Sequence, residues 1–289
     1  MGIPFVKGHG TENDFVLLPD PDGHLALDAA LACAICDRRA GIGADGVIRV
    51  VRCAAYDDEA AVAARADAEW FMDYRNADGS ISEMCGNGIR VLARFLAERQ
   101  GVDTGAPVNI GTRAGVKTAR FGPDGRITTD LGSPRILRET KVAVPGHAWR
   151  ATHVSMGNPH AVAFVASLDD AGDLTSPPAY DPADFPEGVN VEFVARRGQA
   201  HIAIRVHERG SGETRSCGTG ACAATVAASV ADGAPRGVPY LVDVPGGRLE
   251  VTWASDDHVH LTGPAVLVAE GTWNAGKPGC ATVRPLRAR

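Results

Sequence analysis

The sequence of 289 residues contains no long apolar run, and its N-terminus lacks a basic segment followed by an apolar one. A membrane-spanning helix needs roughly 18 consecutive apolar residues, and a secretory signal needs the basic and apolar pair. A net charge of −6 and a pI near 5.8 argue against a nucleic-acid partner and against an anionic membrane surface. We therefore expect a cytoplasmic protein with neither kind of partner.

A regular cysteine framework is also missing. The seven cysteines are odd in number and irregularly spaced, which favours a reducing compartment over a disulfide-bonded secreted fold. Cys33 and Cys36 have C-x-x-C spacing, but they lie in an apolar segment with no second pair downstream, so the pattern does not favour a metal or redox site. We interpret Cys33, Cys53, Cys222 and Cys280 as small apolar residues of the core.

Glycine and proline are abundant but are not clustered. The 34 glycines and 18 prolines are spread along the chain, which indicates many turns and short strands and does not indicate disorder. The hydrophobic content of 45% is that of a globular protein. A chain of this length is too long for one ordinary core and suits two lobes.

Two stretches of the sequence share a pattern around a cysteine. Asn76 stands nine positions before Cys85, and Glu208 stands nine positions before Cys217. Each cysteine is followed by Gly-x-Gly and then by an apolar, helix-forming run. The N–H groups and the positive dipole end at a helix start favour a thiolate over a thiol. We therefore expect the two cysteines to be acid–base groups at the starts of two helices.

Two thiols of matched acidity have a specific chemical use. One thiolate removes a proton from one face of a carbon centre while one thiol supplies a proton to the other face, so the pair inverts the centre in both directions. Cysteine, with an unperturbed pKa of about 8.5, is readily brought close to working pH. Glu208 suits an α-ammonium group, and Arg209 suits a carboxylate. The backbone N–H groups that suit the negative charge developing on a reacting carboxylate belong to Gly86, Asn87, Gly218 and Thr219.

The predicted elements occur twice in the same order, which indicates duplication of a strand-rich lobe with one central helix. The segment 53–68 is interpreted as a solvated insertion in a hairpin. In the first half we expect strands at 3–7 and 14–18 around a loop, a helix at 26–39, strands at 46–51 and 70–74, a helix from Cys85 to about 100, and strands at 107–111, 115–121 and 126–131. In the second half we expect a strand, a tight loop and a strand within 154–164, strands at 187–194 and 202–207, a helix at 219–232, and strands at 238–244, 248–253 and 258–261.

A set of motifs in a fixed order makes the interpretation more specific. The motifs are Lys7-Gly-His-Gly-Thr-Glu-Asn-Asp-Phe15, Gly41-Ile-Gly-Ala-Asp45, Asn76-Ala-Asp-Gly-Ser80, Met84-Cys-Gly-Asn-Gly88, Gly157-Asn-Pro-His160, Gly188-Val-Asn190, Glu208-Arg-Gly-Ser-Gly-Glu213, Cys217-Gly-Thr-Gly220 and Pro245-Gly-Gly247. With these motifs the chain resembles, nearly end to end, the diaminopimelate epimerase family of cofactor-independent, two-cysteine epimerases.

The resemblance implies a fold and an activity. The fold is α+β, with two pseudo-symmetric lobes that are each a barrel-like, strand-rich sheet wrapped around a central helix. The first lobe is residues 1–132 completed by 265–289, and the second is residues 133–264. The activity is interconversion of LL- and meso-2,6-diaminopimelate, on the route to lysine and peptidoglycan precursors, by a homodimer that uses neither pyridoxal phosphate nor a metal.

The resemblance also implies roles for individual residues. Cys85 and Cys217 are the two catalytic bases, in a cleft between the lobes. His160 and Glu208 tune the thiols, and Glu208 helps to hold the α-amine. The backbone of Gly86-Asn87 and of Gly218-Thr219 receives the reacting carboxylate. The residues that hold the distal, non-reacting end of the substrate are Asn13, Asn76, Asn158, Asn190 and Arg209.

Some positions depart from the family pattern. Thr11-Glu12 replaces the usual Leu-Gly beside Asn13, and Gly46 stands where some members have a substrate-contacting glutamine. Ala269 stands where some members have an aromatic residue tied to dimerisation. The segment 53–68 and the residues after about 275 match no motif.

Three alternatives remain at the level of sequence. A proline or hydroxyproline racemase also uses paired cysteines, but its ring substrate has no second amino-acid head and gives no reason to keep Asn76, Asn158, Asn190 and Arg209. A binding protein or isomerase relative that has lost catalysis lacks one or both cysteines, and this chain keeps both. A zinc or thiol–disulfide protein would contain near-stoichiometric zinc that is essential for its activity.

Overall fold

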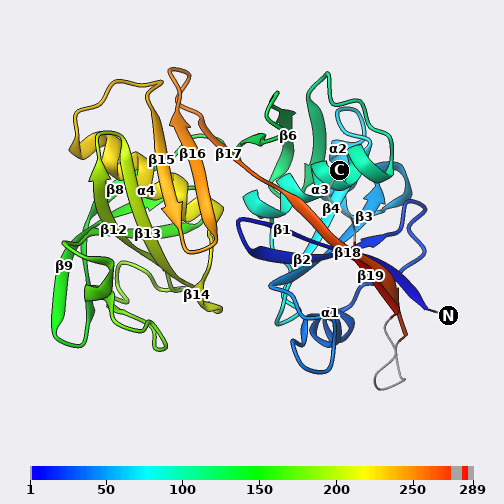
Figure 1. Ribbon diagram of the computed structural model, residues 1–289, viewed down its shortest axis with the longest axis horizontal. Coiled ribbons are helices and arrows are strands. Elements are labelled where there is room, and N and C mark those ends of the chain that lie inside the picture. The colour runs from blue at the N-terminus through cyan, green and yellow to red at the C-terminus, as the bar shows by residue number, and fades with distance from the viewer. Residues whose placement is uncertain (1, 275–281, 286–289) are drawn as a thin grey trace. The chain divides into compact units, whose positions relative to one another are not determined.

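The computed structural model describes residues 2–274 and 282–285 of the chain. It divides into two compact units, Met1–Thr129 with Pro264–Arg289 (unit one) and Asp130–Gly263 (unit two), and Figure 1 shows the elements of each. The boundaries expected from the sequence fall at 132/133 and 264/265. Cys280 and most of the C-terminal tail lie outside the described residues.

Unit one is built on one continuous sheet. The pairs β2–β3 and β4–β5 are parallel, and the other neighbouring pairs are antiparallel. Strand β18 comes from the end of the chain and pairs with β1, with Ile3 opposite Trp273. The strands in spatial order are β19 (Thr282–Pro285), β18 (Val266–Trp273), β1 (Ile3–Gly10), β2 (Asn13–Pro19), β3 (Gly46–Arg52), β4 (Trp70–Asn76), β5 (Val108–Thr112), β6 (Gly115–Phe121) and β7 (Ile127–Asp130).

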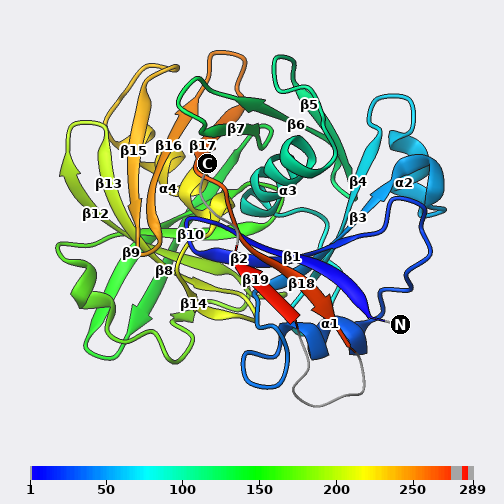
Figure 2. The same ribbon diagram turned by 45° about the vertical axis from the view of Figure 1, so that its right-hand side comes forward.

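Helix α3 (Gly86–Arg99) occupies the core of this unit. It contacts β1, β2, β3, β5, β6 and β18, and Figure 2 shows it beside β1, β5 and β6. All residues from Gly86 to Ala93 are buried, so the first two turns are covered on every side, as expected for a helix enclosed by a sheet. The predicted central helix is confirmed, and its start directly after Cys85 is where the sequence put it.

Two shorter helices cover other faces of unit one. Helix α1 (Ala29–Cys36) is shorter than the predicted 26–39, because the Asp28 carboxylate caps it by accepting from the Leu31 N–H. Helix α2 (Glu59–Ala64) follows a 3₁₀ turn, η1 (Cys53–Ala55). No helix among residues 2–274 has the length and apolar character to cross a membrane.

The segment 53–68 is an insertion between the paired strands β3 and β4, as predicted, but one side of it is buried and not solvated. Ala61, Ala64 and Ala68 recur at helical spacing and are buried, and with Cys53 and Phe71 they belong to a separate apolar cluster. The frequent Asp and Ala residues suggested a polar loop, but alanine at one face of a helix is small enough to pack closely on the sheet. Helix α2 of this segment therefore packs against β5 and β6.

Unit two has the same arrangement of a sheet around a central helix. Its central helix is α4 (Gly218–Ala231), whose first turns are buried like those of α3. The pairs β10–β12 and β13–β15 are parallel, and β14 (Gly212–Thr214) pairs with the end of β13. A 3₁₀ turn, η2 (Leu168–Ala171), precedes β11. The remaining strands in spatial order are β11 (Ala179–Tyr180), β8 (Arg135–Val144), β9 (His147–Ser155), β10 (Pro159–Phe164), β12 (Asn190–Gly198), β13 (His201–Glu208), β15 (Pro239–Val244), β16 (Gly247–Trp253) and β17 (Val259–Gly263).

The two units have the same topology. In unit one, α3 connects β4 to the parallel strand β5, and in unit two α4 connects β13 to the parallel strand β15. Both helices have 14 residues and begin directly after a cysteine. The predicted α+β fold with a repeated order of elements is confirmed. Strands β8, β11, β14, β18 and β19 were not predicted.

The structure explains the departure at Gly46 and allows a test. A Cβ atom at Gly46 would lie 2.4 Å from the Tyr74 ring and 2.7 Å from the backbone oxygen of Arg75, and a backbone atom cannot move aside by a change of rotamer. We expect Gly46→Ala to lower the free energy of unfolding by about 1–3 kcal/mol through overpacking, measured as a lower urea midpoint. Gly198→Ala is the matched control, because its nearest neighbour, a His201 Cβ, is 4.0 Å away. Equal midpoints for the two variants would contradict the argument.

Candidate active site

Cys85 is the N-cap residue of α3. Its backbone is extended (φ −136°, ψ 118°), and its carbonyl accepts from the Ile89 N–H at 2.9 Å. Gly86 and Asn87 form the first turn behind it, so their N–H groups point toward the helix start. The predicted place of a cysteine at a helix mouth with two following amides is therefore found in unit one.

Asn13 joins Cys85 from strand β2. The Cys85 thiol donates to Asn13 Oδ1 at a sulfur–oxygen distance of 3.7 Å, and Asn87 Nδ2 donates to the same oxygen at 3.1 Å. The Asn13 amide nitrogen donates in turn to Asp45 Oδ2 at 2.7 Å. These contacts fix the amide orientation, with its oxygen toward the thiol.

The turn before Asn13 contains the departure from the family pattern. Gly10 pairs with Asn13, so only Thr11 and Glu12 lie between β1 and β2, and the loop predicted from Gly8 is shorter than expected. Both turn residues have positive φ, 49° and 61°, as a two-residue type I′ hairpin requires. The Glu12 N–H donates to His9 Nδ1 at 3.2 Å. Non-glycine residues thus form the tight turn that places Asn13.

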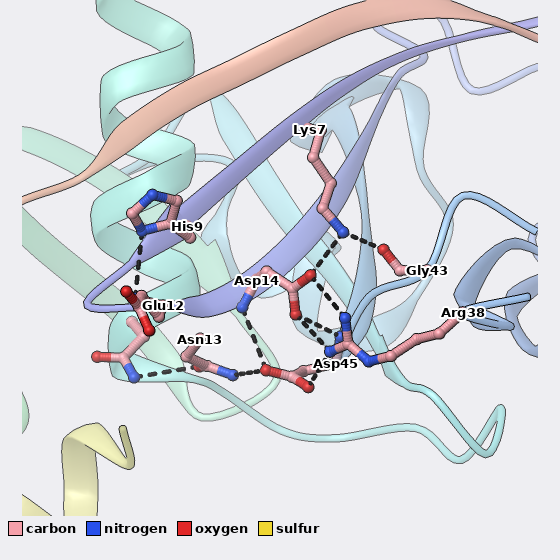
Figure 3. A network of polar contacts seen from close by, with 9 residues as sticks. Lys7, His9, Glu12, Asn13, Asp14, Arg38, Gly43 and Asp45 are labelled. Atoms are coloured by element: carbon pink, nitrogen blue, oxygen red, sulfur yellow. Dashed lines mark hydrogen bonds and ion pairs between the residues drawn. The ribbon is translucent and has the colours of Figure 1, made fainter. Parts of the chain in front are cut away.

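A charged network supports Asn13 from behind, as Figure 3 shows. Arg38 donates to Asp14 and to Asp45, each at 2.7 Å, and Lys7 donates to Asp14 at 2.6 Å. Burial raises the pKa of Asp14, but the hydrogen bonds from Arg38 and Lys7 outweigh it and hold that pKa at about 2. Burial and the nearby Asp14 charge raise the pKa of Asp45. Two cations therefore neutralise two adjacent carboxylates, and one of these carboxylates orients Asn13.

Asn76 ends strand β4 opposite Gly46, and the N–H of the next residue, Ala77, donates to the Asp45 carbonyl at 3.1 Å. The Asn76 side chain donates to Ser80 Oγ at 3.0 Å, and the Asn76 N–H donates to the Ser80 carbonyl at 2.9 Å. These contacts close the predicted Asn76–Ser80 turn. The Asn76 side chain therefore holds its own loop.

In unit two, Cys217 is the N-cap residue of α4. Its sulfur accepts from the Gly220 N–H at 3.3 Å, and it lies 3.5 Å from the Thr219 hydroxyl. Gly218 and Thr219 form the first turn, in the positions that Gly86 and Asn87 have in unit one. A sulfur with two such donors is in a suitable place to carry negative charge.

Burial outweighs the effect of the helix start on the pKa of Cys217. Burial raises the pKa of the Cys217 thiol well above its ordinary value, and the charges of Glu208 and Glu192 raise it further. The Thr219 hydroxyl and the Gly220 N–H act in the opposite direction but do not outweigh burial. The helix start is visible in the sequence, whereas the burial of Cys217, which is 6% exposed, is not.

Asn158 and His160 approach Cys217 from the start of strand β10. Asn158 Nδ2 donates to Thr219 Oγ1 at 3.3 Å, and Asn158 Oδ1 lies 3.0 Å from His160 Nε2. The other ring nitrogen, Nδ1, lies 2.6 Å from Glu192 Oε1 on β12. Four side chains, those of Glu192, His160, Asn158 and Thr219, therefore form a continuous line that ends at Cys217.

The other predicted residues of unit two form a second group. The Arg209 N–H donates to Asn190 Oδ1 at 2.9 Å, and the Arg209 guanidinium donates to the Glu187 carbonyl at 3.1 Å. Glu208, at the end of β13, accepts from the Thr214 hydroxyl. Asn190 and Arg209 are thus adjacent, with an exposed guanidinium anchored to the loop before β12.

The role of the Thr219 hydroxyl can be tested without a substrate. Thr219→Val removes a donor that lowers the pKa of Cys217, so less thiolate forms at a given pH. We expect alkylation of Cys217 by iodoacetamide to slow about tenfold, the effect of one hydrogen bond to a charged group. Mass spectrometry of the Cys217 peptide measures the rate. Cys33 is the internal standard, because it is exposed and does not lie in the core as the sequence had suggested. Thr219→Ser should restore it; an unchanged rate in Thr219→Val would remove the hydroxyl from this role.

Sequence reasoning missed two residues that orient the site. Asp45 stood in a quoted motif but was given no role, and Glu192 was taken as an ordinary strand residue. The available signal for Glu192 was a carboxylate within the otherwise apolar run Val191–Ala195. Such a residue in a buried strand needs a polar partner, although the sequence does not identify His160 as that partner.

Comparison with solved structures shows the fold. The phenazine biosynthesis protein of the PhzF family from Bacillus anthracis matches with a TM-score of 0.71 at 16% identity, over 95% of this chain and 99% of that one. A hydroxyproline epimerase from Agrobacterium vitis, with bound trans-4-hydroxy-L-proline, matches with a TM-score of 0.66 at 13% identity, over 96% and 94%.

Comparison of sequences is more specific. The family model described as diaminopimelate epimerase matches residues 5–137 and 152–268. The diaminopimelate epimerase of Streptomyces coelicolor is 54% identical over 94% of this chain and 96% of its own length, and that of Thermobifida fusca is 51% identical over 92% and 96%. At this identity and coverage the relationship extends to both cysteine motifs, and the chain belongs to the diaminopimelate epimerase family.

Proposed function

We propose that this chain interconverts LL-2,6-diaminopimelate and meso-2,6-diaminopimelate by two-base proton transfer between Cys85 and Cys217. One observation carries the proposal: each cysteine is the N-cap residue of the central helix of its unit. Membership of the family makes the chain an amino-acid epimerase. The reaction proposed here needs neither pyridoxal phosphate nor a metal, and it serves the synthesis of lysine and of peptidoglycan precursors.

The chemistry needs one thiolate and one thiol for each turnover. The thiolate takes the α-proton and becomes a thiol, while the opposite thiol gives its proton to the other face of the α-carbon and becomes a thiolate. The product therefore leaves the two cysteines with exchanged protonation states. The same groups then serve the reverse reaction without help from a cofactor.

The charge that develops on the substrate needs its own donors. When the α-proton leaves, negative charge spreads onto the adjacent carboxylate, and we assign its stabilisation to the first-turn amides of Gly86-Asn87 and Gly218-Thr219. Such preorganised donors need little rearrangement during the reaction. Glu208 is assigned to the α-ammonium group.

The distal end of the substrate is a second amino-acid head. We assign it to five polar side chains, of which Arg209 is suited to a carboxylate and the asparagines to both the carboxylate and the ammonium group. The adjacency of Arg209 and Asn190 supports this assignment, since one backbone hydrogen bond ties them together. The five residues are Asn13, Asn76, Asn158, Asn190 and Arg209.

We also propose a cytoplasmic homodimer. Ala269 lies on β18, where Val266 and Val268 are exposed by 45% and 43%. Apolar side chains exposed next to one another on a strand are suited to an interface with a second copy. Sedimentation equilibrium measures the mass, and a strictly monomeric protein would refute this part of the proposal.

The proposed reaction is tested by following hydrogen and stereochemistry together. The reduced protein is incubated with LL-diaminopimelate in heavy water, in the presence of EDTA and without added cofactor. We expect meso product that carries α-deuterium, because the incoming hydron comes from a solvent-exchanged thiol. The protein could show neither exchange nor inversion with diaminopimelate and yet exchange the α-hydrogen of proline or hydroxyproline. In that case the two-base chemistry would stand and the proposed substrate would be wrong.

A further inference from the structure

Glu192 is a fully buried carboxylate beside the proposed active site. It lies on β12, where Val191 and Phe193 belong to an apolar cluster on one face of the strand. Its own side chain lies on the other face, near α4: a Cβ at Gly220 would come within 2.7 Å of Glu192 Oε1. Glycine at position 220 therefore leaves room for this carboxyl group, which is 0% exposed.

The partner of Glu192 determines how many protons the pair holds. Both ring nitrogens of His160 face an oxygen, Nδ1 at 2.6 Å from Glu192 and Nε2 at 3.0 Å from Asn158 Oδ1. His160 is also 0% exposed, and Glu192 Oε2 has no hydrogen-bond partner among the described residues. A buried pair with a net charge is strongly disfavoured, so it takes up the proton that makes it neutral.

A neutral pair with a proton on Glu192 Oε2 and none on His160 Nε2 is disfavoured, because that buried hydroxyl would have no acceptor among the described residues. The favoured neutral pair keeps its protons elsewhere. It contains two protons, one shared between Glu192 and Nδ1 and one on Nε2, whichever way the shared proton leans. His160 Nε2 is then a donor to Asn158 Oδ1. The Asn158 amide is thereby oriented with its nitrogen toward Thr219, as the 3.3 Å contact shows.

The last link in the line follows from this orientation. Thr219 Oγ1 accepts from Asn158, so its own hydrogen is available for Cys217 Sγ, which lies 3.5 Å away. If Nε2 had no proton, the Asn158 amide would turn over, Thr219 would donate to Asn158, and Cys217 would have to donate to Thr219. The presence or absence of a proton on Nε2 therefore decides the role of the Thr219 hydroxyl. It either donates to a Cys217 thiolate or accepts from a Cys217 thiol.

We propose that Glu192 is a positioning residue for Cys217: with His160 it retains the proton that directs the hydrogen bonds of Asn158 and Thr219 toward the sulfur. This inference rests on the proposed function for its importance in turnover, but the direction of the hydrogen bonds is a property of the protein without substrate. Glu192 touches neither the sulfur nor the proposed substrate groups in the contacts described above.

The direction is measured first in the unaltered protein. Histidine labelled with ¹⁵N reports by NMR whether Nε2 of His160 carries a proton, with the ring assigned by through-bond correlation to its own backbone. We expect a protonated Nε2 at neutral pH. An unprotonated Nε2 would overturn the proposal, whatever substrate the enzyme uses and whether or not any variant folds.

Glu192→Gln then separates this role from that of a nearby negative charge. As a charge alone, Glu192 disfavours a Cys217 thiolate, so its removal would accelerate alkylation of Cys217. As a positioning residue it favours the thiolate, and we expect alkylation to slow about tenfold and kcat to fall about 10- to 100-fold, with KM within about twofold. Faster alkylation, or an unchanged rate, would refute the proposal.

A matched control and a double variant complete the test. Asp243→Asn alters another histidine–carboxylate pair of unit two, in which His201 lies 2.7 Å from Asp243, and it should leave Cys217 alkylation and kcat unchanged. In a Thr219→Val background the last link is already broken, so adding Glu192→Gln should change alkylation little further. Additive effects of the two substitutions would show that Glu192 does not act through Thr219. If alkylation and NMR behave as expected while diaminopimelate does not react, the proposed substrate fails and this inference stands.

Discussion

Cys85→Ala and Cys217→Ala are each expected to abolish inversion of diaminopimelate, with a loss of at least about 1000-fold in kcat, because general acid–base groups contribute factors of this order. Each variant keeps one base. We expect that base to remove a proton from only one face, and therefore to exchange the α-hydrogen of one stereoisomer without inverting it. The two variants should act on opposite isomers.

The measurement is α-deuterium incorporation into LL and meso substrate, followed separately for each variant. Cys222→Ala is the matched control, since it removes a buried thiol from α4 at a position away from the helix start. The control should retain inversion. Normal inversion by either Cys85→Ala or Cys217→Ala would refute the two-base mechanism. If both variants exchange the α-hydrogen of the same isomer, the assignment of one cysteine to each face of the α-carbon would be wrong.

Arg209→Ala is expected to raise KM about 10- to 150-fold, which corresponds to about 1.5–3 kcal/mol for a charge-assisted contact with the distal carboxylate. That end of the substrate does not change charge during the reaction, so the contact is equally strong in the ground and transition states. We therefore expect kcat to stay within a few-fold. Steady-state kinetics with LL-diaminopimelate give both constants.

Two further substitutions refine the Arg209 test. Arg209→Lys keeps the charge but loses the planar fork, and we expect an intermediate KM. Arg248→Ala is the control, because Arg248 is an exposed arginine that pairs with Asp243, and it should leave both constants unchanged. An Arg209→Ala variant with normal KM would remove this residue from the substrate site, and a selective loss of kcat would give it a different role.

The parts of the fold that were predictable depend on local chemistry. Cys85 and Cys217 were correctly placed at helix starts, because Gly-x-Gly before an apolar run is a short-range signal. Strand β8 was missed because residues 135–139 are exposed and show no apolar alternation. It is a strand through its pairing with β9, a partner that the local sequence does not reveal.

The parts of the site that were not predictable depend on tertiary contacts. Asp45 orients Asn13 across 32 positions of sequence, and Glu192 contacts His160 across the same separation. The direction of the pKa shift of Cys217 was not predictable for a similar reason, since the dipole of α4 is visible in the sequence but the burial of the sulfur is not. Sequence patterns pointed to the two cysteines that we propose as the reacting groups, whereas the residues that contact Asn13 and His160 were visible only in the structure.

The late return of the chain to unit one affects how the protein folds while it is being translated. Strand β1 is synthesised before the other described strands, yet one of its two neighbours, β18, is made only after the whole of Asp130–Gly263. Until then one edge of β1 exposes unpaired backbone groups, which are prone to pairing with another chain. Unit two, by contrast, is contiguous and can mature as soon as β17 emerges. The N-terminal half should therefore depend on chaperones for longer than the half that follows it, and nascent chains stalled after Gly263 should associate with one another through β1.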